Sequence, residues 1–438
     1  MTETLVAQSV RRDDDSESSR ARVVIIGGGF AGVAAARALR RSACEVILID
    51  RRNHHIFQPL LYQVATAVLA PSDVSAPLRQ LTRNQANLSV LLAEVLNVNL
   101  GGRCVDVSPV GLPRRTVTFD YLVVATGVQP DYFGHGEFAL HSLSLKTLTD
   151  AELIRSRILG AYELAEQQDD ETARARALTF VLIGAGPTGV ELAASISHMA
   201  RTTLRTNFRR LDPLATRILL LEGATRVLPS FDKALSEKVQ RHLARLGVEV
   251  RTGAMVEVVD DAGVVVGGER IRSDTVLWTA GVKASPLVER LGSDTDRAGR
   301  ARVSEYLNLI DHPRAYVVGD AANVMQDGRA LPGVAQVAIQ QGRFVGQRIS
   351  MQMKGRTPAH AFRYRDRGNM AVVGKNFAIL ERGVLRFSGF STWIVWALLH
   401  VMFLPQLQNR LRVQTQWAWS YLTGQRSARL IVESKHDY

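Results

Sequence analysis

Two glycine-rich motifs of the same pattern occur in this chain, and they constrain its fold more than any other feature. The first spans residues 27–32 (GGGFAG) after the apolar run 23–26, and the second spans residues 184–189 (GAGPTG) after the apolar run 180–183. Each predicts a buried strand, a tight turn and a helix start, where backbone N–H groups and the helix dipole can hold a pyrophosphate. One such motif is a weak signal. Two of them predict two dinucleotides bound at once, most simply FAD and a nicotinamide nucleotide.

The net charge limits the kinds of binding partner, and the cysteines limit the kinds of redox and metal site. The 438 residues carry a formal net charge of +12, which suits an acidic partner, either nucleic acid or an anionic membrane surface. The arginines are scattered, and no helix-turn-helix, zinc-finger or stacking-aromatic pattern is present, so we do not expect nucleic-acid binding. Cys44 and Cys104 are the only cysteines and lie far apart, which excludes a Cys-x-x-Cys redox pair and a structural zinc site. No metal is expected.

The first glycine motif belongs to an alternation of strand and helix, predicted at 23–26, 31–40 and 45–49. The last strand ends in Asp50, 50 − 32 = 18 residues beyond Gly32, where a carboxylate can accept hydrogen bonds from a ribose. Residues 120–127 predict a strand that runs into a glycine turn. Residues 316–322 predict another, so we expect the chain to return to the first domain after an inserted second one.

The second motif repeats this plan with a longer spacing. The strand 217–221 ends in Glu222, 222 − 189 = 33 residues beyond Gly189, whereas the usual gap is about 20. The Arg-rich stretch 201–211 therefore predicts a helix extension or an insertion. Glu222 would bond a ribose diol and repel a 2′-phosphate, which favours NADH over NADPH, although the neighbouring Arg226 weakens that preference.

The predicted fold class is α/β, with two Rossmann-like dinucleotide-binding domains, the second inserted in the first, and a C-terminal amphipathic helical segment that anchors the protein to a membrane. The expected boundaries are a disordered tail (1–20), the FAD-binding domain in two parts (21–145 and 286–365), the NADH-binding domain (146–285) and the membrane-association region (366–438).

The C-terminal region combines tryptophans with basic residues. Its apolar run 393–404 is followed by Pro405 and is shorter than the ~20 residues that a spanning helix needs. A single helical stripe is predicted from Trp393, Trp396, His400, Phe403, Leu407 and Leu411. No acid occurs between Glu381 and Glu433, which indicates a helix lying on an anionic membrane surface. The alternative is a core or dimer helix that buries the same stripe.

With these features in order, the chain resembles the type II NADH dehydrogenases. The resemblance rests on the two glycine motifs, on Gly319-Asp320, and on the segments 53–66 (NHHIFQPLLYQVAT), 277–282 (LWTAGV) and 335–342 (AQVAIQQG). It implies a single-subunit FAD enzyme that oxidises NADH and reduces a membrane quinone without pumping protons. It also implies peripheral attachment to the cytoplasmic face of the cell membrane, and a homodimer.

The motifs and the resemblance together assign candidate binding residues. For FAD these are Gly27, Gly29, Phe30, Ala31, Gly32, Asp50, Ala125, Thr126, Gly127, Gly319, Asp320 and Gln336. For NADH they are Gly184, Gly186, Gly189, Glu191, Glu222 and Gly281.

Three residues are candidates for catalysis. Gln336 and Gln340 share one helical face, and the resemblance points their amides at the quinone carbonyl; an ordinary polar helix face is the alternative. Glu191 would help proton delivery or position the substrate, or would only be a carboxylate stabilised in the first turn of its helix. Pro332 is expected to start a helix whose N-terminus faces the reduced flavin.

Two other functions fit parts of the sequence. A ferredoxin-type FAD reductase shares the architecture but leaves the Trp-rich C-terminal region unexplained. A flavin-bearing NADH redox sensor would show slow turnover with every quinone.

Overall fold

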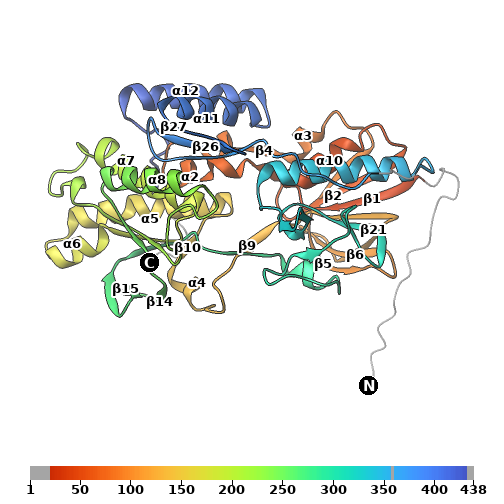
Figure 1. Ribbon diagram of the computed structural model, residues 1–438, viewed down its shortest axis with the longest axis horizontal. Coiled ribbons are helices and arrows are strands. Elements are labelled where there is room, and N and C mark those ends of the chain that lie inside the picture. Colours follow the sequence, from red (N-terminus) through yellow and green to blue (C-terminus); the bar gives the residue numbers. More distant parts are fainter. Residues whose placement is uncertain (1–19, 357–359, 432–438) are drawn as a thin grey trace, which may run out of the picture.

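The computed structural model describes residues 20–356 and 360–431, so the tail predicted for residues 1–20 lies outside it except for Arg20. Two α/β units lie side by side along the long axis of the molecule, and a pair of C-terminal helices covers one of them (Figure 1). The predicted α/β fold class with two dinucleotide-binding domains is confirmed.

The first unit is built on an eight-stranded sheet in the order β20-β21-β8-β1-β2-β5-β6-β7. Its central strands β1, β2, β8 and β21 are parallel, and the core residues of β1 are fully buried. The bounds are β1 Ala21–Ile26, β2 Cys44–Asp50, β5 Leu88–Asn99, β6 Cys104–Pro109, β7 Arg115–Thr118, β8 Tyr121–Val124, β20 Asn308–Leu309 and β21 His312–Val317. Because β20 and β21 follow the second unit in sequence yet complete this sheet, the second domain is inserted in the first, as predicted.

Two helices on this sheet approach each other closely. Helix α1 (Phe30–Ala38) packs on α10 (Ala335–Gln352). A Cβ added to Gly342 would lie 2.1 Å from the carbonyl oxygen of Ala31, and one added to Gly346 would lie 2.6 Å from that of Ala35. This contact ties the 335–342 segment directly to the first glycine motif.

The second unit is built on a five-stranded parallel sheet in the order β10-β17-β11-β12-β13. The bounds are β10 Leu143–Ser144, β11 Thr179–Ile183, β12 Arg217–Glu222, β13 Val248–Thr252 and β17 Thr275–Trp278, with helices α5 Leu148–Gln167, α6 Glu171–Ala177, α7 Pro187–His198 and α8 Lys233–Arg245. The Arg-rich stretch was predicted to extend a helix or form an insertion. The structure shows one π-helical turn, Met199–Thr203, which continues α7 and is followed by an irregular loop. A small antiparallel sheet of β14 (Val256–Asp260), β15 (Gly263–Val266) and β16 (Glu269–Arg272) is added between β13 and β17.

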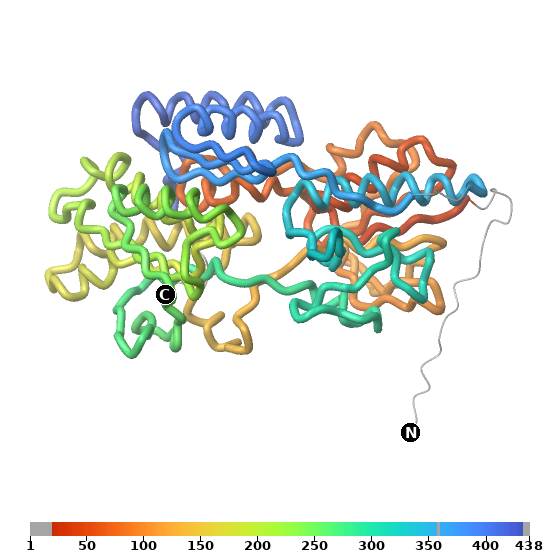
Figure 2. The backbone as a smooth tube through the Cα atoms, in the orientation of Figure 1, coloured from red at the N-terminus to blue at the C-terminus, as the bar shows by residue number. Residues whose placement is uncertain are grey.

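Two segments connect the units and pair with each other. Strand β9 (Val128–Pro130) leads into the second unit, and β18 (Val282–Ala284) leads out of it, in an antiparallel pair. The tube in Figure 2 shows both segments running side by side between the units. The carboxyl ends of β8 and β17, which precede these segments, therefore face the junction.

The C-terminal residues form a third part that packs on the second unit. Strands β25 (Asn369–Val372), β26 (Ala378–Arg382) and β27 (Leu385–Gly389) form an antiparallel sheet, followed by helices α11 (Phe390–Phe403) and α12 (Leu407–Thr423). The single stripe predicted from Trp393 to Leu411 is wrong. Pro405 ends the first helix because it lacks an N–H and restricts the residue before it. Trp396 then faces the core with 3% of its surface exposed, whereas Phe403, from the same predicted stripe, is 54% exposed.

Three side chains fix this part to the rest of the molecule. The buried guanidinium of Arg426 donates to the carbonyl oxygens of Thr66 (2.6 Å) and Ser195 (3.0 Å). Asn409 donates to backbone carbonyls of residues 72–75, and the indole N–H of Trp417 donates to the side chain of Gln63. Within the described residues, no helix is long and apolar enough to cross a membrane.

Candidate functional site

The first residue of each glycine motif adopts a conformation that only glycine tolerates well. The φ angles are +105° at Gly27 and +102° at Gly184. A Cβ would lie 2.3 Å from the carbonyl oxygen of Ala125 at the first position, and 2.6 Å from the nitrogen of Ala280 at the second. Each turn therefore packs against the segment that follows β8 or β17 and leads to the other domain.

The third residue of each motif borders open space. Gly29 and Gly186 are the N-caps of α1 and α7, and a Cβ on either would meet no atom within 4 Å. By contrast, a Cβ on Gly32 or Gly189 would lie within 2 Å of a carbonyl oxygen of the same turn. Free N–H groups at a helix N-terminus beside open space suit a pyrophosphate, so both clefts fit a dinucleotide.

The two ribose-binding candidates occupy equivalent places. The carboxylate of Asp50 accepts hydrogen bonds from the backbone N–H groups of Gly28 (2.6 Å) and Arg52 (2.7 Å). Glu222 accepts them from Ala185 (2.6 Å) and Ala224 (2.8 Å). The longer spacing in the second domain therefore leaves Glu222 where Asp50 stands in the first. Each carboxylate oxygen retains a free lone pair for a ribose hydroxyl.

Arg226, the basic residue near this position, makes a hydrogen bond of its own. Its guanidinium donates to the carbonyl oxygen of Pro229 (2.8 Å). Its remaining N–H donors and its charge stay available, so the preference for NADH stays weakened by this residue.

Polar groups with unused hydrogen-bonding capacity gather beside the first cleft. The hydroxyl of Thr126, between Ala125 and Gly127, is shielded from solvent and has no hydrogen-bond partner. Burial raises the pKa of Asp320, while the positive charges of Lys146 and Arg300 lower it. Gly319, at φ +72°, donates its N–H to the side chain of Gln341 (2.6 Å). These groups fit the hydroxyls and ring edge of FAD, whose pyrophosphate would lie at Gly29.

Sequence reasoning missed two residues here. Gln341 is 1% exposed and holds the Gly319 turn, yet the motif drew attention to its neighbour Gln340. Lys146 follows β10 and lines a small cavity with Thr188 and Gly281 of the second cleft. Burial lowers its pKa, while the negative charges of Asp320 and Asp150 raise it. Its position at the carboxyl end of a parallel strand, where ligands bind in such sheets, could have marked Lys146 as a candidate binding residue.

Glu191 lies one turn further into α7 than predicted, beyond the first turn where the helix dipole acts strongly. Its carboxylate accepts one long hydrogen bond, from the N–H of Val372 (3.4 Å). Burial raises its pKa to about 8, so the group is mostly neutral at pH 7. The interpretation of Glu191 as a dipole-stabilised carboxylate is therefore wrong. The side chain is instead a neutral carboxylic acid, which leaves proton delivery and substrate positioning as its predicted roles.

The amides of Gln336 and Gln340 lie on one face of α10, as the spacing predicted, and both bind backbone. Gln340 exchanges two hydrogen bonds of 3.0 Å with the N–H and carbonyl of Arg365. Gln336 donates to the carbonyl of Gly368 (2.9 Å) and accepts from the N–H of Arg367 (3.2 Å). This segment continues into β25 and so to the N–H that Glu191 accepts. The quinone role of the two amides stays a prediction.

The helix that Pro332 was expected to start begins at Ala335, so Pro332 precedes it. Gly333 nevertheless lies against Asp320, because a Cβ there would be 3.2 Å from the carboxyl carbon. The segment before α10 therefore packs against Asp320, and the approach of this N-terminus to the flavin stays a prediction.

Aromatic rings connect the first glycine motif to the C-terminal helices. Phe30 makes edge contacts with His55 (4.9 Å between centroids) and Phe57 (5.9 Å). Phe57 contacts His400, which packs on Trp396. His55 also hydrogen-bonds the carbonyl of Gly28 through Nδ1. The cleft and the surface of α11 thus belong to one continuous packing unit.

Comparison with known proteins places this geometry among characterised relatives. The family model described as pyridine nucleotide-disulphide oxidoreductase matches residues 21–342. The chain is 39% identical over 415 residues to the type II NADH:quinone oxidoreductase Ndh of Mycobacterium tuberculosis, a match that spans 92% of this chain and 89% of the relative. It is 41% identical over 421 residues to the type II NADH:quinone oxidoreductase NdhA of the same organism, spanning 93% and 88%.

Solved structures share the fold. The structure of NDH2 from Plasmodium falciparum in complex with NADH superposes with a TM-score of 0.85 at 17% identity, covering 94% of this chain and all of that one. The sulfide:quinone oxidoreductase of Aquifex aeolicus superposes with a TM-score of 0.72 at 16% identity, covering 94% and 96%.

Proposed function

This chain belongs to the family of type II NADH:quinone oxidoreductases, and we propose that NADH binds at the second glycine turn, FAD at the first, and the quinone between α10 and the C-terminal helices. The enzyme is an FAD-dependent oxidoreductase that oxidises NADH and reduces a quinone without pumping protons. Bound FAD supplies the hydride acceptor and passes two electrons on.

The observation that carries the assignment of the two clefts is their residue-by-residue equivalence. In each, a carboxylate accepts the N–H of the motif's second residue, and open space borders its third residue. At the second cleft the proposal takes NADH rather than NADPH as the substrate, because Glu222 would repel a 2′-phosphate. Lys146 and Gly281, which line the small cavity beside Thr188, would border the nicotinamide and flavin rings.

Anaerobic stopped-flow separates the two half-reactions. NADH is mixed with the yellow enzyme first, and a soluble quinone is added to the bleached enzyme second. The proposal expects fast bleaching followed by fast recovery of flavin absorbance. A stable bleached form that no quinone reoxidises would favour the redox-sensor alternative.

Replacing both amides tests the quinone role of α10. We expect Gln336→Ala with Gln340→Ala to slow reoxidation by quinone about tenfold to a hundredfold, because four hydrogen bonds that order residues 365–368 are lost. Bleaching by NADH should stay near the wild-type rate. Equal loss of both half-reactions would remove the pair from the quinone site.

The raised pKa of Glu191 predicts a pH dependence. Its proton is held up to about pH 8 in the folded enzyme and lost above it, so quinone turnover should fall as the pH rises through that value. Glu191→Gln should abolish this fall. If Glu191 delivers a proton, the variant is slow at every pH; if it only positions substrate, the variant keeps the low-pH rate. An unchanged fall near pH 8 in the variant would exclude Glu191.

We further propose that the exposed apolar residues of α11 and α12 bind the membrane surface, on the cytoplasmic face where NADH is available. Leu398, Met402 and Leu407 are among these exposed side chains, and the quinone substrate is itself apolar. A homodimer is proposed on the resemblance alone, and sedimentation of the purified enzyme tests it.

A further inference from the structure

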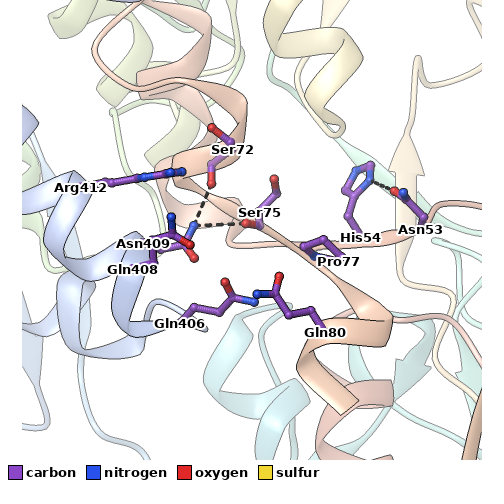
Figure 3. A pocket seen from close by; sticks show the side chains of 10 residues that line it. All are labelled: Asn53, His54, Ser72, Ser75, Pro77, Gln80, Gln406, Gln408, Asn409 and Arg412. Carbon is purple, nitrogen blue, oxygen red and sulfur yellow. Dashed lines mark hydrogen bonds between the residues drawn. The ribbon is translucent and has the colours of Figure 1, made fainter. Parts of the chain in front are cut away.

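A cavity of about 290 Å³, lined mostly by residues with polar side chains, lies between α12 and the β3–β4 region of the first domain (Figure 3). One wall comes from β3 (His54–Ile56), β4 (Ser75–Pro77) and α3 (Leu78–Thr82), and the other from the first turns of α12. The motifs described above assign no role to this cavity.

The cavity carries positive charge and no negative charge on its lining. Arg412 is its only arginine or lysine, and none of the lining residues is acidic. Within the described residues, no hydrogen bond or ion pair occupies the guanidinium of Arg412, which extends toward Ser72 in Figure 3. An unpaired guanidinium in a concave, acid-free site suits a phosphate, because its fork of N–H donors matches the phosphate oxygens.

Neutral groups around the arginine suit hydroxyls. The amides of Gln80 and Gln406 face each other across the cavity and make no hydrogen bond with other described residues. Nδ1 of His54 lies 2.9 Å from the side-chain oxygen of Asn53 and so donates to it, which leaves Nε2 as an acceptor. That Nε2 is shielded from solvent and has no partner. Because this shielded atom is out of reach of a ligand in the cavity, the two amides are the groups left to bind a hydroxyl.

The walls are held in place before any ligand arrives. Asn409 uses its side-chain N–H groups on the carbonyls of Ser72 (2.8 Å), Asp73 (2.9 Å) and Ser75 (3.1 Å). Because these bonds fix α12 to the opposite wall, the cavity keeps its shape, and ordering it costs little on binding.

We propose that this cavity binds a phosphate ester that carries free hydroxyl groups, with Arg412 on the phosphate and the amides of Gln80 and Gln406 on the hydroxyls. The helix that lines the cavity also carries Leu407 and Leu411, which are 70% and 55% exposed and do not line it. That position favours the headgroup of an anionic phospholipid such as phosphatidylglycerol over a soluble ester. This choice of source, though not the phosphate chemistry, rests on the membrane role proposed above.

The soluble arm of the test uses calorimetric titration of the FAD-loaded enzyme with sn-glycerol 3-phosphate. Arg412→Gln should weaken binding about tenfold or more, since a charged hydrogen-bonding group is lost. Gln80→Trp, which fills the cavity without changing charge, should weaken it as well. Arg382→Gln removes the same charge from an exposed site on β26 outside the cavity and should change nothing. No binding by the wild type, or equal loss in Arg412→Gln and Arg382→Gln, overturns the proposal.

The lipid arm uses flotation with phosphatidylcholine vesicles that contain equal fractions of either phosphatidylglycerol or phosphatidylserine. The wild type should prefer phosphatidylglycerol, and both cavity variants should lose that preference. Binding of glycerol 3-phosphate without any such preference overturns the lipid source and supports a soluble ester. Failure to bind any vesicle refutes the membrane role, and the soluble arm still decides the site.

Discussion

A Gly186→Val variant should stay yellow and lose its reduction by NADH. Gly186 has an extended backbone, at φ −68° and ψ −178°, that valine adopts readily, and an added Cβ would meet no protein atom within 4 Å. It would instead fill the space before α7 where we place the NADH pyrophosphate. Losing the hydrogen bonds to that group costs about 3 kcal/mol, so we expect bleaching at a fixed low NADH concentration to slow about a hundredfold.

The matched control is Gly29→Val in the first cleft, where the backbone is also extended and the space also open. This variant should fold without FAD and still bind NADH, which fluorescence titration of NADH measures. Thermal melting establishes that both proteins are folded, and dithionite should still bleach the flavin of Gly186→Val. Normal reduction of Gly186→Val by NADH would refute the assignment of the second cleft.

Local backbone chemistry explains why the two clefts could be predicted from the sequence. Gly27 and Gly184 need a positive φ, and their surroundings exclude a side chain, so only glycine fits these two positions. The end of a buried strand likewise predicted Asp50 and Glu222. The unusual spacing before Glu222 does not change its position at the end of β12, because the additional residues form a π-helical turn and a loop outside the sheet.

Contacts between distant segments could not be predicted in this way. Lys146 belongs to no motif, and only the pairing of β10 with β17 brings it beside Gly281 and Thr188. The partners of Gln336 and Gln340 come from a segment without regular structure, whose path the sequence leaves open. The apolar stripe failed for a related reason: Trp396 packs against Trp417 in the core, and only tertiary packing decides which apolar side chains remain exposed.

That packing also decides how membrane attachment must be tested. Trp396, Val401, Leu404 and Val413 belong to the same buried cluster as the core of the second domain. Truncation before Gly389 would therefore expose the core, and loss of membrane binding would follow from unfolding alone. Substitutions on the exposed side of the helices avoid this difficulty.

Replacing Leu398, Met402 and Leu411 by glutamate should release the enzyme from anionic vesicles. These side chains are 58%, 65% and 55% exposed, so the folded protein tolerates charge there. Loss of three apolar contacts with lipid costs about 3 kcal/mol, or about a hundredfold in partitioning, and repulsion from anionic lipid adds to it. Flotation measures the partitioning, and turnover with a soluble quinone should be unchanged.

The control replaces Val110, Leu112 and Leu140 by glutamate. These apolar residues lie outside the C-terminal region and are 71%, 65% and 80% exposed. It should float like the wild type, because those residues lie outside α11 and α12. If the α11–α12 variant floats as well as the control, these helices do not bind lipid. If it fails to float only because a wild-type dimer has become a monomer, which sedimentation of both proteins detects, the exposed face is instead a contact between two copies of the chain.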